Sequence, residues 1–72
     1  MSAPMVQSVI FPKEKFSLPK ARKWLKDHHY REQKVDITEH FYRFRQMRPM
    51  KGGRYTTIAL PNGVQIILHY YK

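Results

Sequence analysis

The C-terminal part of this 72-residue chain, RYTTIALPNGVQIILHYY (residues 54–71), is the feature that most limits the folds open to it. Two runs rich in β-branched and aromatic residues flank Pro61-Asn62-Gly63. An Asn-Gly pair between two such runs is typical of the tight turn that joins antiparallel strands. The segment therefore predicts a β-hairpin, and with it an antiparallel sheet.

The N-terminal half predicts one strand followed by one helix. Val6–Phe11 is apolar and β-branched, and Pro12 ends it. Ser17 is a candidate helix N-cap, because its hydroxyl can accept a hydrogen bond from the first turn. The apolar positions that then recur at helical spacing are Leu18, Ala21, Trp24, Leu25 and His28. They indicate an amphipathic helix of about three turns, with His29 at the left-handed position that usually follows a helix.

The middle of the chain reads as extended. Val35 and Ile37 alternate with polar residues, a turn is expected near Thr38-Glu39, and a strand is expected at Phe41–Met47, before a loop at Pro49–Gly53. The predicted fold class is α+β: an antiparallel sheet of about four to five strands with one amphipathic helix packed on one face. Residues 1–72 are expected to form a single domain, with residues 1–5 as a disordered N-terminal tail.

Alternation along the strands divides the sheet into two faces. The face predicted to pack under Ala21, Trp24 and Leu25 carries Phe44, Ile58, Leu60, Val64, Ile66 and Leu68. The opposite face carries Arg43, Arg45, Tyr55, Thr57, Gln65, Ile67, His69 and Tyr71. This second face has three interpretations, which the sequence leaves open. It is a ligand surface on which bases stack and guanidinium groups contact phosphates, a set of arginines paired with Asp36 and Glu39, or a dimer interface.

Charge is the strongest functional signal in the composition. Fourteen Lys and Arg residues face five Asp and Glu residues, so the net charge is +9. Such an excess attracts polyanions, and nucleic acid is the default partner for a small basic domain. The alternative is a solvated basic surface with no dedicated partner. The residues predicted to contact nucleic acid are Lys20, Arg22, Lys23, Lys26, Arg43, Arg45, Lys51 and Arg54.

Several other classes of function are not expected. The chain has no cysteine, and its four histidines match no standard metal-site spacing, so no metal or other cofactor is predicted. The sequence shows neither a Ser/His/Asp set nor a carboxylate pair at useful spacing, and we predict no enzyme. The apolar stretches are too short to cross a bilayer, so no membrane association is expected. A small core without disulfides often gains stability by oligomerising, which makes a homodimer possible.

The segment ARKWLKDHHYREQKVDITEHFYRFRQMRP (residues 21–49) resembles a short module that accompanies prohead proteases of the XkdF type in tailed phages and large DNA viruses. The matching residues are Ala21, Trp24, Leu25, Lys26, His28, Tyr30, Val35, Asp36, Thr38, Tyr42, Arg43, Phe44, Arg45 and Gln46. The likeness covers residues 8–49 well and the hairpin loosely, and His29 stands where the module has glycine. Short, very basic versions resemble small proteins of the Marseillevirus group.

The resemblance implies a viral protein, located in the virion or in the cytoplasm or nucleus of an infected host; nothing catalytic carries over. Combined with the charge, it predicts a small protein that binds nucleic acid, expected to be DNA, through the phosphate backbone with little sequence preference. The alternative is a protein–protein module of capsid or head assembly. Because similar YRFRQ segments need not bind DNA, the phosphate contacts are expected mainly from the helix and the adjacent loop, at Lys20, Arg22, Lys23, Lys26, Lys51 and Arg54.

Overall fold

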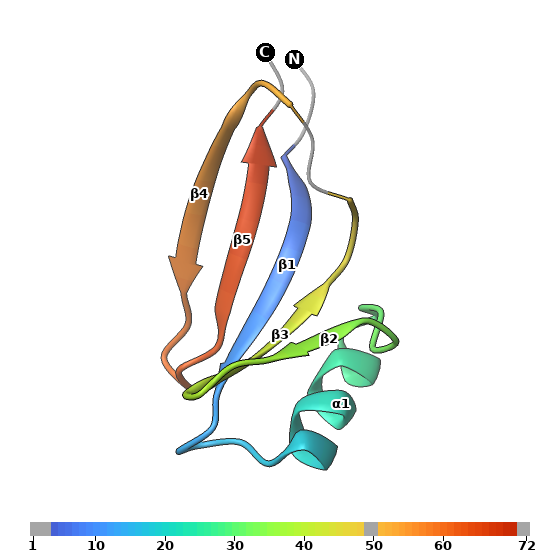
Figure 1. The fold of residues 1–72 in the computed structure, drawn as a ribbon, viewed down its shortest axis with the longest axis vertical. Coiled ribbons are helices and arrows are strands. Elements are labelled where there is room, and N and C mark those ends of the chain that lie inside the picture. Colours follow the sequence, from blue (N-terminus) through green and yellow to red (C-terminus); the bar gives the residue numbers. More distant parts are fainter. Residues whose placement is uncertain (1–3, 49–50, 71–72) are drawn as a thin grey trace.

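The computed structural model describes residues 4–48 and 51–70, which form five strands and one helix (Figure 1). The elements are β1 (Met5–Pro12), α1 (Leu18–Asp27), β2 (Val35–Ile37), β3 (Phe41–Arg45), β4 (Arg54–Ala59) and β5 (Gln65–Tyr70). The strands lie in the order β2-β3-β1-β5-β4, and every neighbouring pair is antiparallel. The predicted α+β fold with one helix beside an antiparallel sheet is therefore confirmed.

The predicted hairpin forms between β4 and β5. The Val64 N–H donates to the Asn62 side-chain oxygen (3.1 Å), and Gly63 adopts a φ of 95° while its N–H donates to the Leu60 carbonyl (3.0 Å). The strand predicted at Phe41–Met47 ends two residues early, at Arg45. One further backbone bond, from the Gln46 N–H to the Gln7 carbonyl (2.8 Å), still joins the chain to β1 beyond this end of β3. Gln7 lies at the register shift of β1 against β5, between Val6 and Ser8.

The ends of α1 follow the sequence prediction closely. The Ser17 hydroxyl accepts a hydrogen bond from the Lys20 N–H (3.3 Å), as expected for an N-cap. At the other end, the Tyr30 N–H donates to the Leu25 carbonyl (2.8 Å) and the His29 N–H donates to the Lys26 carbonyl (3.2 Å). These two bonds form a Schellman motif, which requires the left-handed φ of 63° at His29.

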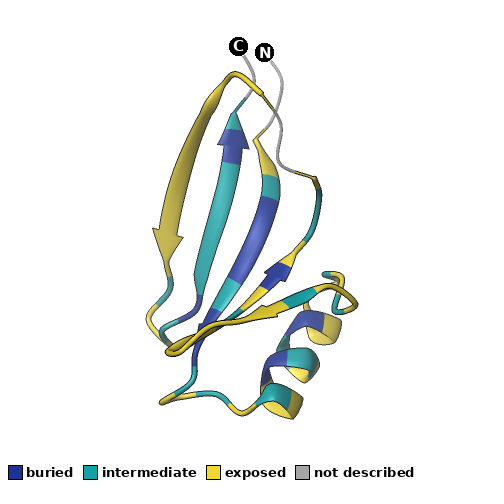
Figure 2. Ribbon diagram, viewed as in Figure 1, coloured by how far each residue is buried: buried dark blue, intermediate teal, exposed yellow. Residues whose placement is uncertain are grey.

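The core lies where α1 crosses β1 and β3 (Figure 2). Its fully buried apolar residues are Val9, Phe11, Ala21, Leu25, Phe44 and Val64. Phe11 is at the centre of this cluster, with ring centroids 5.1 Å from Phe16, 5.6 Å from Trp24 and 5.6 Å from Phe44, each in an edge-on arrangement. The central strand β1 therefore supplies one of the two largest buried side chains, and β3 supplies the other, Phe44.

The core departs from the sequence prediction in two places. Ile58 was expected under the helix but is 42% exposed, because α1 covers β1 and β3 and leaves β4 without a second layer. His69 was expected on the open face but is fully buried: its Nε2 lies 2.8 Å from the Gly52 carbonyl, and its ring packs against Tyr55 at 4.7 Å. Trp24 is half-buried.

Of the tail predicted at residues 1–5, residues 1–3 lie outside the described part, and Met5 begins β1.

Replacing the central aromatic side chain tests this description of the core. Phe11→Ala is expected to lower the free energy of unfolding by about 3–5 kcal/mol, because it leaves a cavity between the helix and two strands. The matched control is Phe41→Ala on β3, whose ring is 37% exposed and whose loss should cost less than about 1 kcal/mol. Urea unfolding followed by circular dichroism measures both, and equal losses would contradict the assigned core.

The left-handed residue after α1 gives a second prediction. His29→Gly is expected to raise the free energy of unfolding by about 1 kcal/mol, because glycine adopts a positive φ without the steric cost of a Cβ. His28→Gly is the control: His28 has a negative φ and stacks on Trp24 at 3.8 Å, so its replacement should destabilise the protein. Thermal melts of both variants supply the measurement, and a less stable His29→Gly protein would show that the imidazole makes a compensating contact.

Candidate functional site

The predicted cations on α1 are mostly paired with acids. Lys23 Nζ lies 3.1 Å from Asp27, one helical turn further along. Arg22 and Lys26 both lie close to the carboxylate of Glu32, at 3.9 Å and 3.8 Å. The outer face of the helix therefore carries less net positive charge than its sequence suggests.

The two predicted arginines of β3 also have partners within the fold. Arg45 Nη2 lies 2.9 Å from Asp36 on the neighbouring strand, which confirms the local pairing considered for this residue. Arg43 instead contacts neutral groups of β1: its Nε donates to the Ser8 hydroxyl and its Nη2 to the Gln7 side-chain oxygen, both at 3.4 Å. Both arginines thus tie β3 to an adjacent strand.

The remaining predicted cations do not form one surface. Lys51 precedes β4 and Arg54 is its first residue, at one end of the sheet, whereas Lys20 lies in the first turn of α1 at the other end (Figure 1). None of the three takes part in an ion pair within the described part of the chain. The expected site that combines the helix with the loop before β4 is therefore not assembled.

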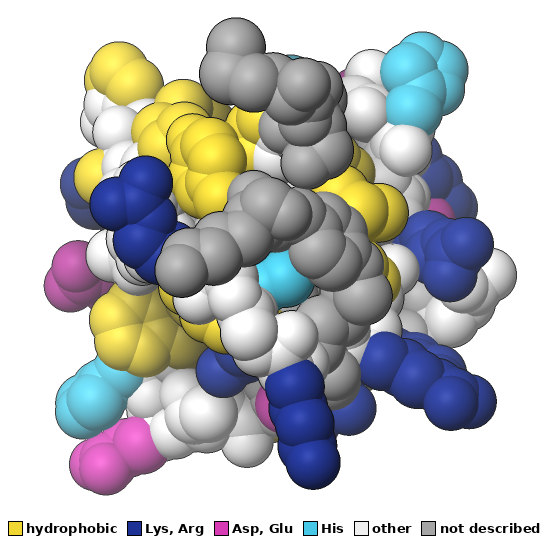
Figure 3. Space-filling model, turned by 90° about the horizontal axis from the view of Figure 1, so that it is seen from above, with side chains coloured by type: hydrophobic (Ala, Val, Ile, Leu, Met, Phe, Trp, Pro, Cys, Tyr) yellow, Lys and Arg dark blue, Asp and Glu magenta, His cyan; other side chains and the backbone are white. Residues whose placement is uncertain are grey.

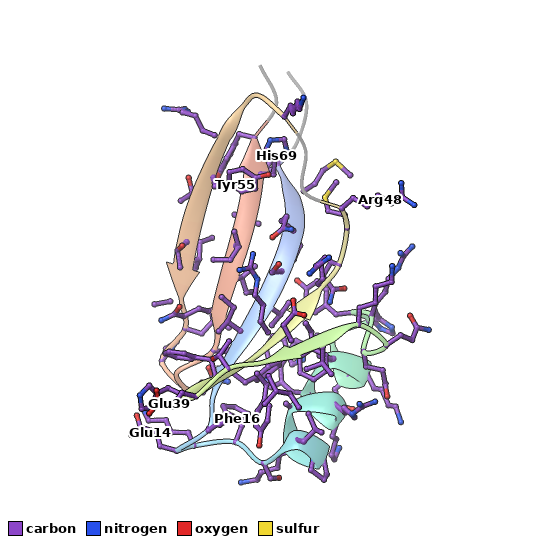
Figure 4. The ribbon with its side chains drawn as sticks, viewed as in Figure 1. Glu14, Phe16, Glu39, Arg48, Tyr55 and His69 are labelled. Atoms are coloured by element: carbon purple, nitrogen blue, oxygen red, sulfur yellow. The ribbon has the colours of Figure 1, made fainter. Side chains whose placement is uncertain are left out.

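A different set of cations does come together, around a pocket of about 170 Å³ between the α1–β2 loop and the end of β3. Its lining residues are Arg31, Gln33, Lys34, Arg45, Gln46, Met47 and Arg48, and we call it the basic pocket. Arg31, Lys34 and Arg48 have no carboxylate within 4 Å among the described residues. Figure 3 shows Lys and Arg side chains on several sides of the molecule, including a group on the right of the view, and Figure 4 shows Arg48 pointing outward past the end of β3.

The side chain of Gln46 holds the two walls of the basic pocket together. Its Oε1 accepts a hydrogen bond from the Arg31 N–H (2.7 Å), and its Nε2 donates to the Arg31 carbonyl (2.8 Å). The Arg45 N–H donates to the Lys34 carbonyl (3.0 Å), which fixes the other end of the loop. These three bonds hold the backbone of Arg31 and Lys34 against the end of β3, close to the position of Arg48 in the sequence.

The acids that do not pair with these cations lie elsewhere. Glu39 approaches His40 at 3.8 Å rather than either arginine of β3, so the pairing considered for Glu39 is not formed. Glu14 and Glu39 line a pocket beside Phe41, which is the first residue of β3 (Figure 4). The basic pocket is at the opposite end of β3, so these two acids do not offset its charge.

Sequence reasoning missed Arg31, Lys34 and Arg48 because they follow predicted elements rather than lie on them. Arg31 and Lys34 belong to YREQK, and its single acid, Glu32, points back toward the helix cations. The sequence did contain one signal of this pocket. Lys and Arg residues are dense just before and just after the strands predicted in the middle of the chain, and only one acidic residue, Glu32, lies among them.

The described residues contain no group of three or more His, Asp or Glu side chains placed to hold a metal ion. Within the same residues, no helix has the length and apolar character needed to cross a bilayer. Comparison of the chain with known protein families, curated proteins and solved structures found no match. The likeness to the viral module stays a prediction, as does the expectation that the chain is not an enzyme.

Removing the Gln46 side chain tests how the pocket is held. Gln46→Ala is expected to lower the free energy of unfolding by about 1–3 kcal/mol and to speed amide exchange at Arg31, because its bonds to the loop disappear. Gln33→Ala is the control, since Gln33 is exposed and lines the same pocket without a hydrogen bond to the loop backbone among the described contacts. Unchanged exchange at Arg31 in Gln46→Ala would show that other contacts hold the loop.

Proposed function

We propose that this protein binds nucleic acid through the phosphate backbone, with the basic pocket as its main contact. The observation that carries the proposal is that Arg31, Lys34 and Arg48 line one pocket and that none of the three has a carboxylate within 4 Å in the described structure. Like charges that line one pocket repel one another, so an arrangement of this kind favours an anionic ligand. The net charge of +9 supplies the long-range attraction that brings a polyanion to the protein.

The donors around the basic pocket suit phosphodiester groups. Arginine offers a planar fork that matches two phosphate oxygens, and lysine adds a compact charge. The pocket is lined by no aromatic ring, so it offers no platform on which a base would stack. Contacts of this kind position a protein on the backbone without reading bases, which supports binding with little sequence preference. The resemblance to the viral module favours DNA as the polymer.

Two variants with the same change in net charge test this proposal. The pocket variant combines Arg31→Gln, Lys34→Gln and Arg48→Gln, and the helix variant combines Lys20→Gln, Lys23→Gln and Lys26→Gln. Each removes three positive charges. The pocket variant is expected to lose affinity by about 30-fold or more, and its salt slope should flatten by about 2 to 3, because each lost phosphate contact removes about 0.9 from the slope on duplex DNA. The helix variant should lose less than about 5-fold, since two of its cations already have acid partners.

Fluorescence-anisotropy titrations at about 50 and about 200 mM salt provide the measurement, with duplex DNA, single-stranded DNA, RNA and a scrambled DNA sequence. Equal losses in the two variants would show that net charge alone governs binding, and a larger loss in the helix variant would move the site to α1. Absence of binding by the wild-type protein at the lower salt concentration would overturn the proposal and favour the protein–protein alternative.

A further inference from the structure

The outer edge of β4 lacks the features that usually protect the edge of a sheet. All six residues of Arg54–Ala59 are exposed, and no described strand pairs with their outer side (Figure 2). Edge strands in monomeric proteins are usually short, charged, bulged or interrupted by proline. β4 is regular along its pairing with β5, contains no proline, and carries one charge, at its first residue. By contrast, the edge strand β2 is three residues long and contains Asp36.

Hydrogen bonds fix which backbone groups of β4 point outward. The Leu60 N–H donates to the Val64 carbonyl across the hairpin (2.8 Å). In an antiparallel ladder the bonded residues alternate, so Ile58 and Thr56 also direct their backbone groups toward β5. The residues between them, with Thr57 in the middle of the strand, direct their N–H and carbonyl groups away from the sheet.

We propose that β4 pairs with β4 of a second copy of this chain, antiparallel and about a two-fold axis at Thr57. A two-fold axis perpendicular to the sheet matches each face with the same face of the partner, and it requires a residue to lie opposite its own copy. We place the axis at Thr57 because it is the middle one of the three outward-pointing residues, so the pairing extends over the whole strand. The register then places the small Ala59 beside the large Tyr55 of the other copy.

The distribution of charge favours a second copy as the occupant. Two proteins of net charge +9 repel, so they associate best where they carry the least charge. The β4 edge is such a place: between Tyr55 and Ala59 it has no charged residue. In the proposed register the two Arg54 residues lie roughly 20 Å apart along the strands, more than twice the Debye length of about 8 Å in physiological salt.

The proposed dimer is a continuous ten-stranded sheet. The basic pocket of each copy lies beside the end of β3, on the β2 side of the sheet and away from β4. Pairing through β4 therefore leaves both pockets uncovered, at the two outer parts of the assembly. The inference concerns the protein alone and does not depend on nucleic-acid binding.

Proline substitutions on the two edges distinguish this interface from others. Thr57→Pro removes an outward N–H of β4 without removing a bond to β5. Ile37→Pro is the matched control: the Thr38–Phe41 and Lys34–Arg45 bonds show that Ile37 likewise points its N–H outward, on the β2 edge. We expect sedimentation equilibrium in about 0.5 M salt, where charge repulsion is screened, to show a mass rising from 8.7 kDa toward twice that value with concentration.

Thr57→Pro should raise the dissociation constant of the dimer by about 30-fold or more relative to the wild-type protein, and Ile37→Pro should leave it unchanged. A monomeric wild-type protein at all concentrations would overturn the inference, and so would a dimer that Ile37→Pro disrupts and Thr57→Pro does not.

Amide hydrogen exchange of the wild-type protein tests the same contact without any variant. The amides of Thr57 and Ala59 should become protected as the protein concentration rises, whereas that of Ile37 on the opposite edge should exchange at one rate throughout. Protection that does not depend on concentration, or that appears at Ile37 instead, would also exclude pairing through β4. Because no nucleic acid is present, this outcome is separate from the success or failure of the proposed binding function.

Discussion

The packing of one aromatic ring, Phe11, fixes the helix on the sheet. Phe11 makes edge-on contacts with three other rings: Phe16 before the helix, Trp24 in the helix and Phe44 on the neighbouring strand. These contacts fix α1 over β1 and β3, so the chain must return to β3 as soon as the helix ends. The return brings the α1–β2 loop against the end of β3, where Gln46 secures it. The basic pocket is a consequence of this packing.

The length of α1 sets a limit on the rest of the sheet. Ten residues of helix span about 15 Å, whereas the molecule extends over 36 Å. The part of the sheet beyond the helix therefore has no second layer, and its side chains find cover in other ways. His69 is buried by the loop before β4, through the Gly52 carbonyl and the Tyr55 ring, while Ile58 has no such cover and remains exposed. The single layer also explains why all six residues of β4 are exposed.

The elements were predictable from sequence because their signals are local. The turn at Asn62-Gly63, the N-cap at Ser17 and the left-handed residue at His29 each depend on a few neighbouring residues, and each occurs as expected. Burial depends on which elements cover one another, which alternation along a strand does not reveal. For that reason Ile58 was placed in the core and His69 outside it. The basic pocket escaped prediction for the same reason, since its cations meet only after the loop folds back on β3.

The positions of the five acids, more than those of the fourteen cations, decide where positive potential emerges from this protein. Glu32 lies in the sequence between Arg31 and Lys34, yet its carboxylate turns toward Arg22 and Lys26. That single orientation reduces the charge of the helix and leaves the loop cations uncompensated. Asp27 and Asp36 act similarly on Lys23 and Arg45, and the remaining acids lie at the far end of β3. An exposed ion pair contributes little to stability. In this molecule such pairs act mainly by distributing charge: they offset the cations of the helix and leave Arg31, Lys34 and Arg48 uncompensated around one pocket, while Lys20, Lys51 and Arg54 stay without an ion pair elsewhere in the described structure.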